Sequence, residues 1–155
     1  MLFPTPEFLF KLTLAIILGG LIGLERSVSN KSAGFRTMIL ICMSSTLFIK
    51  IGMYMVDNPA LFGQVSIAVI IGNTIAGIGF LGAGSIIKTH GDTGAAVEGL
   101  TTAATIWFVA GIGLLIGGGL FWHAIVATLY TLAILLLFGR IEKAAVNYIA
   151  TKRKR

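Results

Sequence analysis

Gly72-Asn73-Thr74-Ile75-Ala76-Gly77-Ile78-Gly79-Phe80-Leu81-Gly82-Ala83-Gly84 is the stretch that decides the fold of this chain. It lies inside an apolar run over residues 65–87, which is long enough to cross a bilayer as a helix, since that takes roughly 20 residues. Because small residues let another backbone come close, we expect this third span to be the hub on which the other segments pack. On a helix its small residues share one stripe, made up of Ala68, Gly72, Ala76, Gly79 and Ala83.

Three glycines of this stretch also match the dinucleotide-binding fingerprint G-x-G-x-x-G, at Gly77, Gly79 and Gly82. That fingerprint needs a short strand before it and a helix of a soluble βαβ unit after it. Here the apolar residues continue through the glycines, and Glu98, at about the place of the ribose-binding acid, lies beyond a glycine-rich loop. We therefore expect no nucleotide site and no cofactor.

The composition is that of an integral membrane protein. Of the 155 residues, 56% are hydrophobic and only 12% are charged, whereas a soluble domain carries about 25% charged residues. The apolar runs are continuous rather than alternating, which favours a helical bundle over a barrel. Cys42 lies in one of these runs and is the single cysteine, so we expect a small buried side chain without a disulfide.

The predicted fold class is all-α, a polytopic bundle of five transmembrane helices. The spans cover residues 8–24, 38–56, 65–87, 100–116 and 120–138. They form one domain over residues 1–140, and residues 141–155 form a short basic cytoplasmic tail. The net charge is +6, and the last four residues are all basic. We expect this tail to meet anionic lipid headgroups of the bilayer rather than nucleic acid.

Basic residues occupy alternate connections between the spans. The connections at residues 57–63 and 117–119 hold no Lys or Arg. By the positive-inside rule, the N-terminus then lies outside and the C-terminus lies in the cytoplasm. The basic residues of the cytoplasmic side are Arg26, Lys31, Arg36, Lys88, Arg140, Lys143 and the four of the tail.

Two further lysines, Lys11 and Lys50, lie within apolar runs near the predicted outer ends. Each can extend its ammonium group to the interface, and Glu7, one turn before Lys11, is well placed for an ion pair. Anchoring of the helix ends is the simpler interpretation. A functional charge inside the membrane is the alternative.

Charged residues gather at the predicted cytoplasmic ends of the spans. Gly19 and Gly23 form a GxxxG pair for close helix contact, and Glu25-Arg26 follow them directly. A carboxylate just before the fourth span is favoured by the helix dipole. We expect a functional cluster at this rim, with separate interfacial anchors as the alternative. Its charges are Glu25, Arg26, Arg36 and Glu98, and its polar support is Thr37, Thr101 and Thr102.

Asn73 is predicted near mid-membrane, where a lone amide is costly unless it is paired. It either hydrogen-bonds a neighbouring helix or lines a path for ions or water. His90 and Asp92 offer only two ligands on a flexible loop, so we expect no metal site. No nucleophile–base pair or paired carboxylates stand out, and we expect no catalytic residues and no enzyme activity.

Four motifs taken in order resemble the MgtC/SapB family. They are Gly-Leu-Glu-Arg, Ala-Gly-Phe-Arg-Thr, Gly-Ile-Gly-Phe-Leu-Gly-Ala-Gly and Glu-Gly-Leu-Thr-Thr-Ala-Ala-Thr-Ile-Trp, within residues 18–117. The resemblance implies a bacterial inner-membrane protein linked to magnesium limitation. Better-known members resemble regulators of other membrane machinery and carry a soluble domain after the membrane part. We expect this chain to correspond to the membrane part alone.

The resemblance favours a small regulator or adaptor in magnesium or envelope homeostasis. Such a protein would dock its helices on other membrane proteins and form a homo-oligomer, with a dimer favoured. The alternative is an oligomeric ion channel or transporter subunit, with Asn73 and the charged rim as its path.

Overall fold

The computed structural model describes residues 5–91, 94–139, 141 and 148–149. Within them, five helices are long and apolar enough to cross a membrane, which confirms the predicted bundle. These helices are α1 (Pro6–Val28), α2 (Phe35–Asp57), α4 (Ile67–Gly84), α5 (Leu100–Gly117) and α6 (Phe121–Ala133), which continues as the π-helical segment η1 (Ile134–Phe138). The short helix α3 (Pro59–Phe62) connects α2 to α4.

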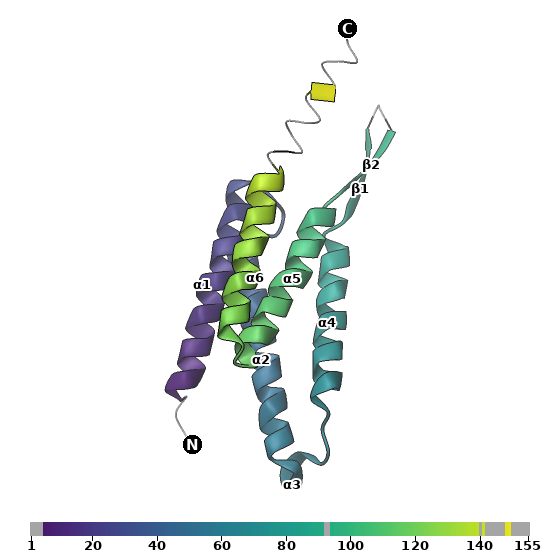
Figure 1. Ribbon diagram of the computed structural model, residues 1–155. Coiled ribbons are helices and arrows are strands. Elements are labelled where there is room, and N and C mark those ends of the chain that lie inside the picture. The colour runs from purple at the N-terminus through teal and green to yellow at the C-terminus, as the bar shows by residue number, and fades with distance from the viewer. Residues whose placement is uncertain (1–4, 92–93, 140, 142–147, 150–155) are drawn as a thin grey trace.

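The long helices run side by side, so the bundle has two ends (Figure 1). At the end that we call the hairpin end, α1 finishes, α2 and α5 begin, and a β-hairpin projects from the bundle. At the other end, which we call the α3 end, α1 begins and α5 finishes next to the start of α6. The basic residues expected in the C-terminal tail, together with Arg140 and Lys143, lie outside the described residues.

The connection between α4 and α5 is a β-hairpin, not the flexible loop that the sequence suggested. Strand β1 (Ile87–Gly91) pairs antiparallel with β2 (Gly94–Glu98), and Ile87 lies opposite Glu98. Gly99 then turns the chain into α5 with a φ of +91°, and an added Cβ there would press on the carbonyl oxygen of Ser85. Backbone conformation and space therefore both require glycine at this position.

Helix α2 lies at the centre of the packing, between α1 and α5. On the α1 side, a Cβ added at Gly19 would lie 2.8 Å from Cys42 Cβ, and one added at Gly23 would lie 2.8 Å from Phe35 Cα. On the α5 side, a Cβ added at Gly113 would lie 2.8 Å from Ser45 Cβ. Glycines on two neighbours therefore let both backbones approach α2 closely. Cys42 is a buried free thiol between them, as expected.

The prediction that the third span is the hub is wrong. Helix α4 packs on α5 and α2 through one side only, and its buried residues are Thr74, Ile78 and Gly82. Successive helix residues are about 100° apart, so this buried row lies about 120° around the helix from the middle of the small-residue stripe. A Cβ added at Gly72 or Gly79 would meet no described atom within 4 Å. The exposed members of the stripe are Ala68, Gly72, Ala76, Gly79 and Ala83.

Candidate functional site

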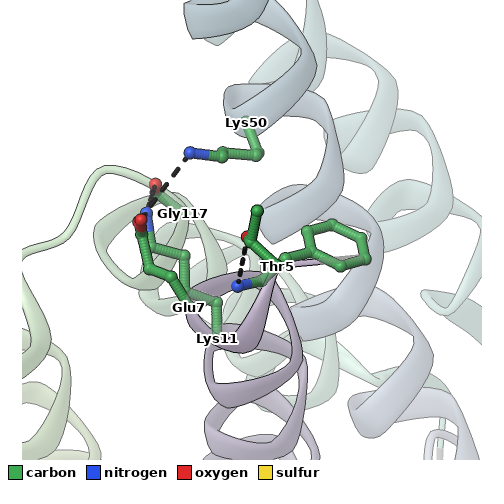
Figure 2. Close-up of polar contacts among 6 residues, drawn as sticks. Thr5, Glu7, Lys11, Lys50 and Gly117 are labelled. Atoms are coloured by element: carbon green, nitrogen blue, oxygen red, sulfur yellow. Dashed lines mark hydrogen bonds and ion pairs between the residues drawn. The ribbon is translucent and has the colours of Figure 1, made fainter. Parts of the chain in front are cut away.

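A buried lysine joins α1 to α5 at the α3 end of the bundle (Figure 2). Lys11 is 3% exposed, and its ammonium group donates a hydrogen bond to the carbonyl oxygen of Gly117 at 3.0 Å. It also forms the predicted ion pair with Glu7, at 2.8 Å, and Lys50 Nζ lies 3.7 Å from the same carboxylate oxygen. A cation at the last turn of α5 complements the helix dipole. Lys11 therefore joins the start of α1 to the end of α5.

Arg26 is the buried charge at the hairpin end. It is 3% exposed, although it lies in the last turn of α1. Its Nη2 donates to the hydroxyl of Thr102 at 3.2 Å, and its Nη1 lies 3.6 Å from Oε2 of Glu25. The other carboxylate oxygen of Glu25 accepts a hydrogen bond from Ser29 at 2.8 Å. Three members of the predicted cluster, Glu25, Arg26 and Thr102, therefore meet.

The way α1 ends brings further polar residues to this place. Asn30 takes the left-handed conformation with a φ of +53°. Its N–H donates to Ser27 O at 3.1 Å, and the N–H of Lys31 donates to Arg26 O at 2.9 Å. This pair of hydrogen bonds is the Schellman motif, which closes a helix and turns the chain back. The hydroxyl of Ser27 then accepts from the N–H of Phe35 at 2.8 Å, which fixes the start of α2.

A pocket of about 800 Å³ lies at the hairpin end between the turn after α1, the base of the β-hairpin and the start of α5. Four of the predicted residues line it, namely Arg26, Glu98, Thr101 and Thr102. Glu98 and Thr101 are exposed, whereas Arg26 and Thr102 form the buried floor. The pocket thus combines a buried cation with hydroxyl groups and one carboxylate.

Sequence reasoning did not place Asn30, Ser32 and Ser85 in this site, although all three line the pocket. Lys31, which the sequence assigned only to the cytoplasmic side of the membrane, lines the pocket as well. The stretch Ser29-Asn30-Lys31-Ser32 could have predicted that α1 ends here and that the chain turns back. Asn is the commonest residue after glycine at a left-handed helix end. No local pattern predicted that Ser85 lies at the pocket, because the β-hairpin that follows Ser85 was not predicted.

Arg36 and Thr37 do not join the cluster. Both are exposed at the start of α2, and neither lines the pocket. Phe35 and Met38 are the residues of that turn that contact Gly23 of α1, so the two residues between them project away from α1. Among the described residues, no ion pair joins Arg36 to Glu98 or to Glu25.

Asn73 is exposed on α4, on the side away from the buried row. Within the part of the chain that the structure describes, its amide makes no hydrogen bond. The side chain of His90 and all of Asp92 lie outside the description. Over residues that are described, no group of three His, Cys, Asp or Glu side chains could hold a metal ion.

Comparison with known proteins gives one family and several curated relatives. The model of the MgtC family matches residues 12–144 of this chain. "Protein SrpB" of Synechococcus elongatus is 37% identical over 140 residues, which are 88% of this chain and 77% of that protein. "Putative magnesium transporter YhiD" of Escherichia coli is 37% identical over 145 residues, which are 92% of this chain and 66% of that protein.

"Protein MgtC" of Brucella abortus is 41% identical over 120 residues, which are 77% of this chain and 46% of that protein. The chain therefore spans between about half and three quarters of the length of these three relatives. Among solved structures there is no significant match.

Proposed function

Because this chain belongs to the MgtC family, we propose that it is a regulator or adaptor of the bacterial inner membrane that docks transmembrane helices of other membrane proteins. The observation that supports this proposal best is the exposed face of α4. The docked protein serves magnesium homeostasis, and this part of the proposal rests on the name of the Escherichia coli relative, which refers to magnesium transport. No enzymatic step is part of the proposed function.

The face of α4 has the properties of a helix-binding surface. Glycines in α1 and α5 are in close contact with α2, whereas Gly72 and Gly79 of α4 have open space beside them. The amide of Asn73 borders this open stripe and is exposed. In hydrocarbon, an amide without a partner is costly, and a hydrogen bond to a second helix stabilises the contact by about 1 kcal/mol. A docked helix would satisfy both features at once.

We propose that the occupant is a transmembrane helix of a different protein. A second copy of the chain, giving a homodimer, is the competing occupant. A second function, an oligomeric magnesium channel or transporter subunit, is favoured by the name of the Escherichia coli relative and by the polar Asn73 on an outward face. In that case the α4 faces of several copies would enclose the path.

The test compares Gly79→Leu with Gly77→Leu, because a Cβ at either glycine meets no described atom within 4 Å. The two glycines are two positions apart, about 160° around the helix by the shorter way, so only Gly79 lies on the stripe. Gly77 lies one turn after Asn73, on the side of Asn73 that faces away from the stripe. Photocrosslinkers are placed at Val69, another exposed residue of α4, in native membranes. We expect a defined partner to crosslink to the wild type and to Gly77→Leu, and at least tenfold less to Gly79→Leu.

Thermal stability in detergent should be the same for both variants, which separates a lost partner from a lost fold. Equal crosslinking by both variants would refute the docking face. Crosslinks to the same chain only would assign the face to a homodimer. Magnesium flux through the purified protein in liposomes, lost in Gly79→Leu, would favour the transporter.

We also propose that the hairpin end faces the cytoplasm, with the N-terminus outside. Arg26, Lys31 and Arg36 lie at this end, and the positive-inside rule supports the assignment. In a Cys42→Ala background, cysteines introduced at Asn58 and at position 151 should react with an impermeant maleimide from opposite sides. Reaction of both from the same side would reverse this conclusion.

A further inference from the structure

We propose that the pocket at the hairpin end binds a phosphate group, held by Arg26 and by the first turn of α5. This site is independent of the α4 face and of the proposed docking function. A phosphate on a lipid headgroup and a free phosphate ion share the chemistry that the pocket recognises. The two sources are separated by the experiment below.

The guanidinium of Arg26 has a buried donor left over. Its Nη2 donates to Thr102 and its Nη1 faces Glu25. Its Nε is buried and, among the described residues, has no hydrogen-bond partner. A buried donor without a partner costs free energy, and a guanidinium can present two parallel N–H groups to an oxyanion. Arg26 lines the pocket, and in our proposal the missing acceptor is an oxygen of a phosphate bound there.

The start of α5 adds backbone donors to the same pocket. Gly99 precedes the helix and offers no side chain to cap it, and no side-chain hydrogen bond caps this end. The N–H groups of the first turn, from Leu100 to Thr102, have no partner inside the helix. Leu100 and Thr102 both line the pocket. The N-terminus of an 18-residue helix carries a partial positive charge and is a natural site for phosphate.

Thr102 links the two sets of donors. Its hydroxyl oxygen accepts a hydrogen bond from Arg26 at 3.2 Å. A hydroxyl that accepts one hydrogen bond still has its own hydrogen to donate. Arg26, the Thr102 hydroxyl and the first turn of α5 therefore converge from α1 and α5 on one place, with residues that are 76 positions apart in the sequence.

Two exposed side chains at the pocket have opposite charges and give the proposal a signed test. Lys31 attracts an oxyanion, and Glu98 repels it. Both are exposed, so each can be neutralised without disturbing the core. Lys88 is a matched control, because it is an exposed lysine of the adjacent strand that does not line the pocket. The variants are Lys31→Gln, Glu98→Gln and Lys88→Gln.

In the first experiment the full chain is purified in dodecyl maltoside, which carries no phosphate, and inorganic phosphate is titrated at constant ionic strength with thermal stability as the readout. In the second, phosphatidylglycerol retained by the protein is counted by native mass spectrometry. In whichever experiment shows binding, we expect Lys31→Gln to weaken it about threefold and Glu98→Gln to strengthen it about threefold, the size of an exposed charge contact. Lys88→Gln should match the wild type.

Saturable binding of inorganic phosphate with this signed pattern would show a soluble ligand. The same pattern in retained phosphatidylglycerol alone would show a lipid headgroup. Either result supports the site. The proposal is overturned if neither probe binds, or if all three variants behave alike, because the pocket would then hold water only.

Discussion

Replacing Gly113 by alanine should weaken the contact between α2 and α5, which lies at the centre of the bundle. The new Cβ would press against the carbonyl oxygen of Cys42 and lie 2.8 Å from Ser45 Cβ. Carbon atoms in contact are normally about 3.5–4.0 Å apart. The two helices must therefore separate locally by roughly 0.7–1.2 Å to accept a single methyl group.

The expected cost has three parts. Overpacking of this kind costs about 1–3 kcal/mol. The separation also lengthens the contact between the Thr46 hydroxyl and the carbonyl oxygen of Gly113, now 3.0 Å, and losing a hydrogen bond between membrane helices costs about 0.6 kcal/mol. Alanine favours a helix over glycine by about 1 kcal/mol, which offsets part of the loss. We therefore expect Gly113→Ala to lower the free energy of unfolding by about 0.6–2.6 kcal/mol.

Gly111→Ala is the matched control in the same helix. It makes the same chemical change two residues away, but an added Cβ there meets no described atom within 4 Å. The overpacking and hydrogen-bond losses should be absent, and only the helix propensity remains. We expect Gly111→Ala to leave stability unchanged or to raise it by up to about 1 kcal/mol.

The buried thiol of Cys42 provides the assay, since it is the only cysteine and lies at the contact itself. A thiol-reactive dye in detergent reports unfolding as Cys42 becomes accessible on heating. For a chain of this length, the expected loss corresponds to a fall in Tm of roughly 1–10 °C. Equal Tm values for Gly113→Ala and Gly111→Ala would show that α2 and α5 do not approach as closely as described, and would refute the reasoning.

The same thermal assay checks three further predictions. Lys11→Met should lower the free energy of unfolding by about 1–3 kcal/mol, because a carbonyl oxygen at the end of α5 loses its buried donor. Lys50→Met removes a longer and more exposed ion pair and should lower it by less than about 1 kcal/mol. Equal losses would contradict the role of Lys11. Arg26→Gln should lower the free energy of unfolding by about 3 kcal/mol, because a buried ion pair loses one partner. Arg36→Gln changes an exposed side chain and should alter it by less than about 0.5 kcal/mol. A larger loss for Arg36→Gln would mean that Arg36, not Arg26, is the buried arginine. Gly99→Ala should destabilise by more than about 1 kcal/mol, since a left-handed backbone and a neighbouring carbonyl oxygen both exclude a Cβ; a neutral result would mean that the turn into α5 is not as described.

Much of the architecture could be predicted from the sequence because its causes are local. Apolar runs of about 20 residues must be helical in lipid, where each backbone group needs a partner within its own segment. The Glu7–Lys11 ion pair was predictable for the same reason, since residues four apart on a helix are neighbours. The β-hairpin was missed because its two strands are only five residues each and meet at glycines, which are as common in loops as in hairpin turns.

The candidate site was predictable only in part. The motifs around Glu25-Arg26 and Thr101-Thr102 predicted the start of α5 as part of the site, together with three residues that are in contact, Glu25, Arg26 and Thr102. Arg36 carries the same charge as Arg26 and lies only ten positions further on, yet it is exposed and Arg26 is buried. The difference depends on which side of the first turn of α2 faces α1, and no property of Arg36 itself reveals that side.

Local sequence therefore determines that this chain forms membrane-spanning helices, where they begin and end to within a few residues, and which of them carry small residues that permit a close approach. Tertiary packing alone decides which of those approaches are made. Both α4 and α5 are rich in glycine, but Gly113 and Gly117 of α5 contact α2, whereas Gly72 and Gly79 of α4 have open space beside them. A glycine removes a steric barrier without attracting a partner. Whether a helix fills the space depends on the complementary surface that another segment presents, here the side of α2 that holds Cys42, Ser45 and Thr46.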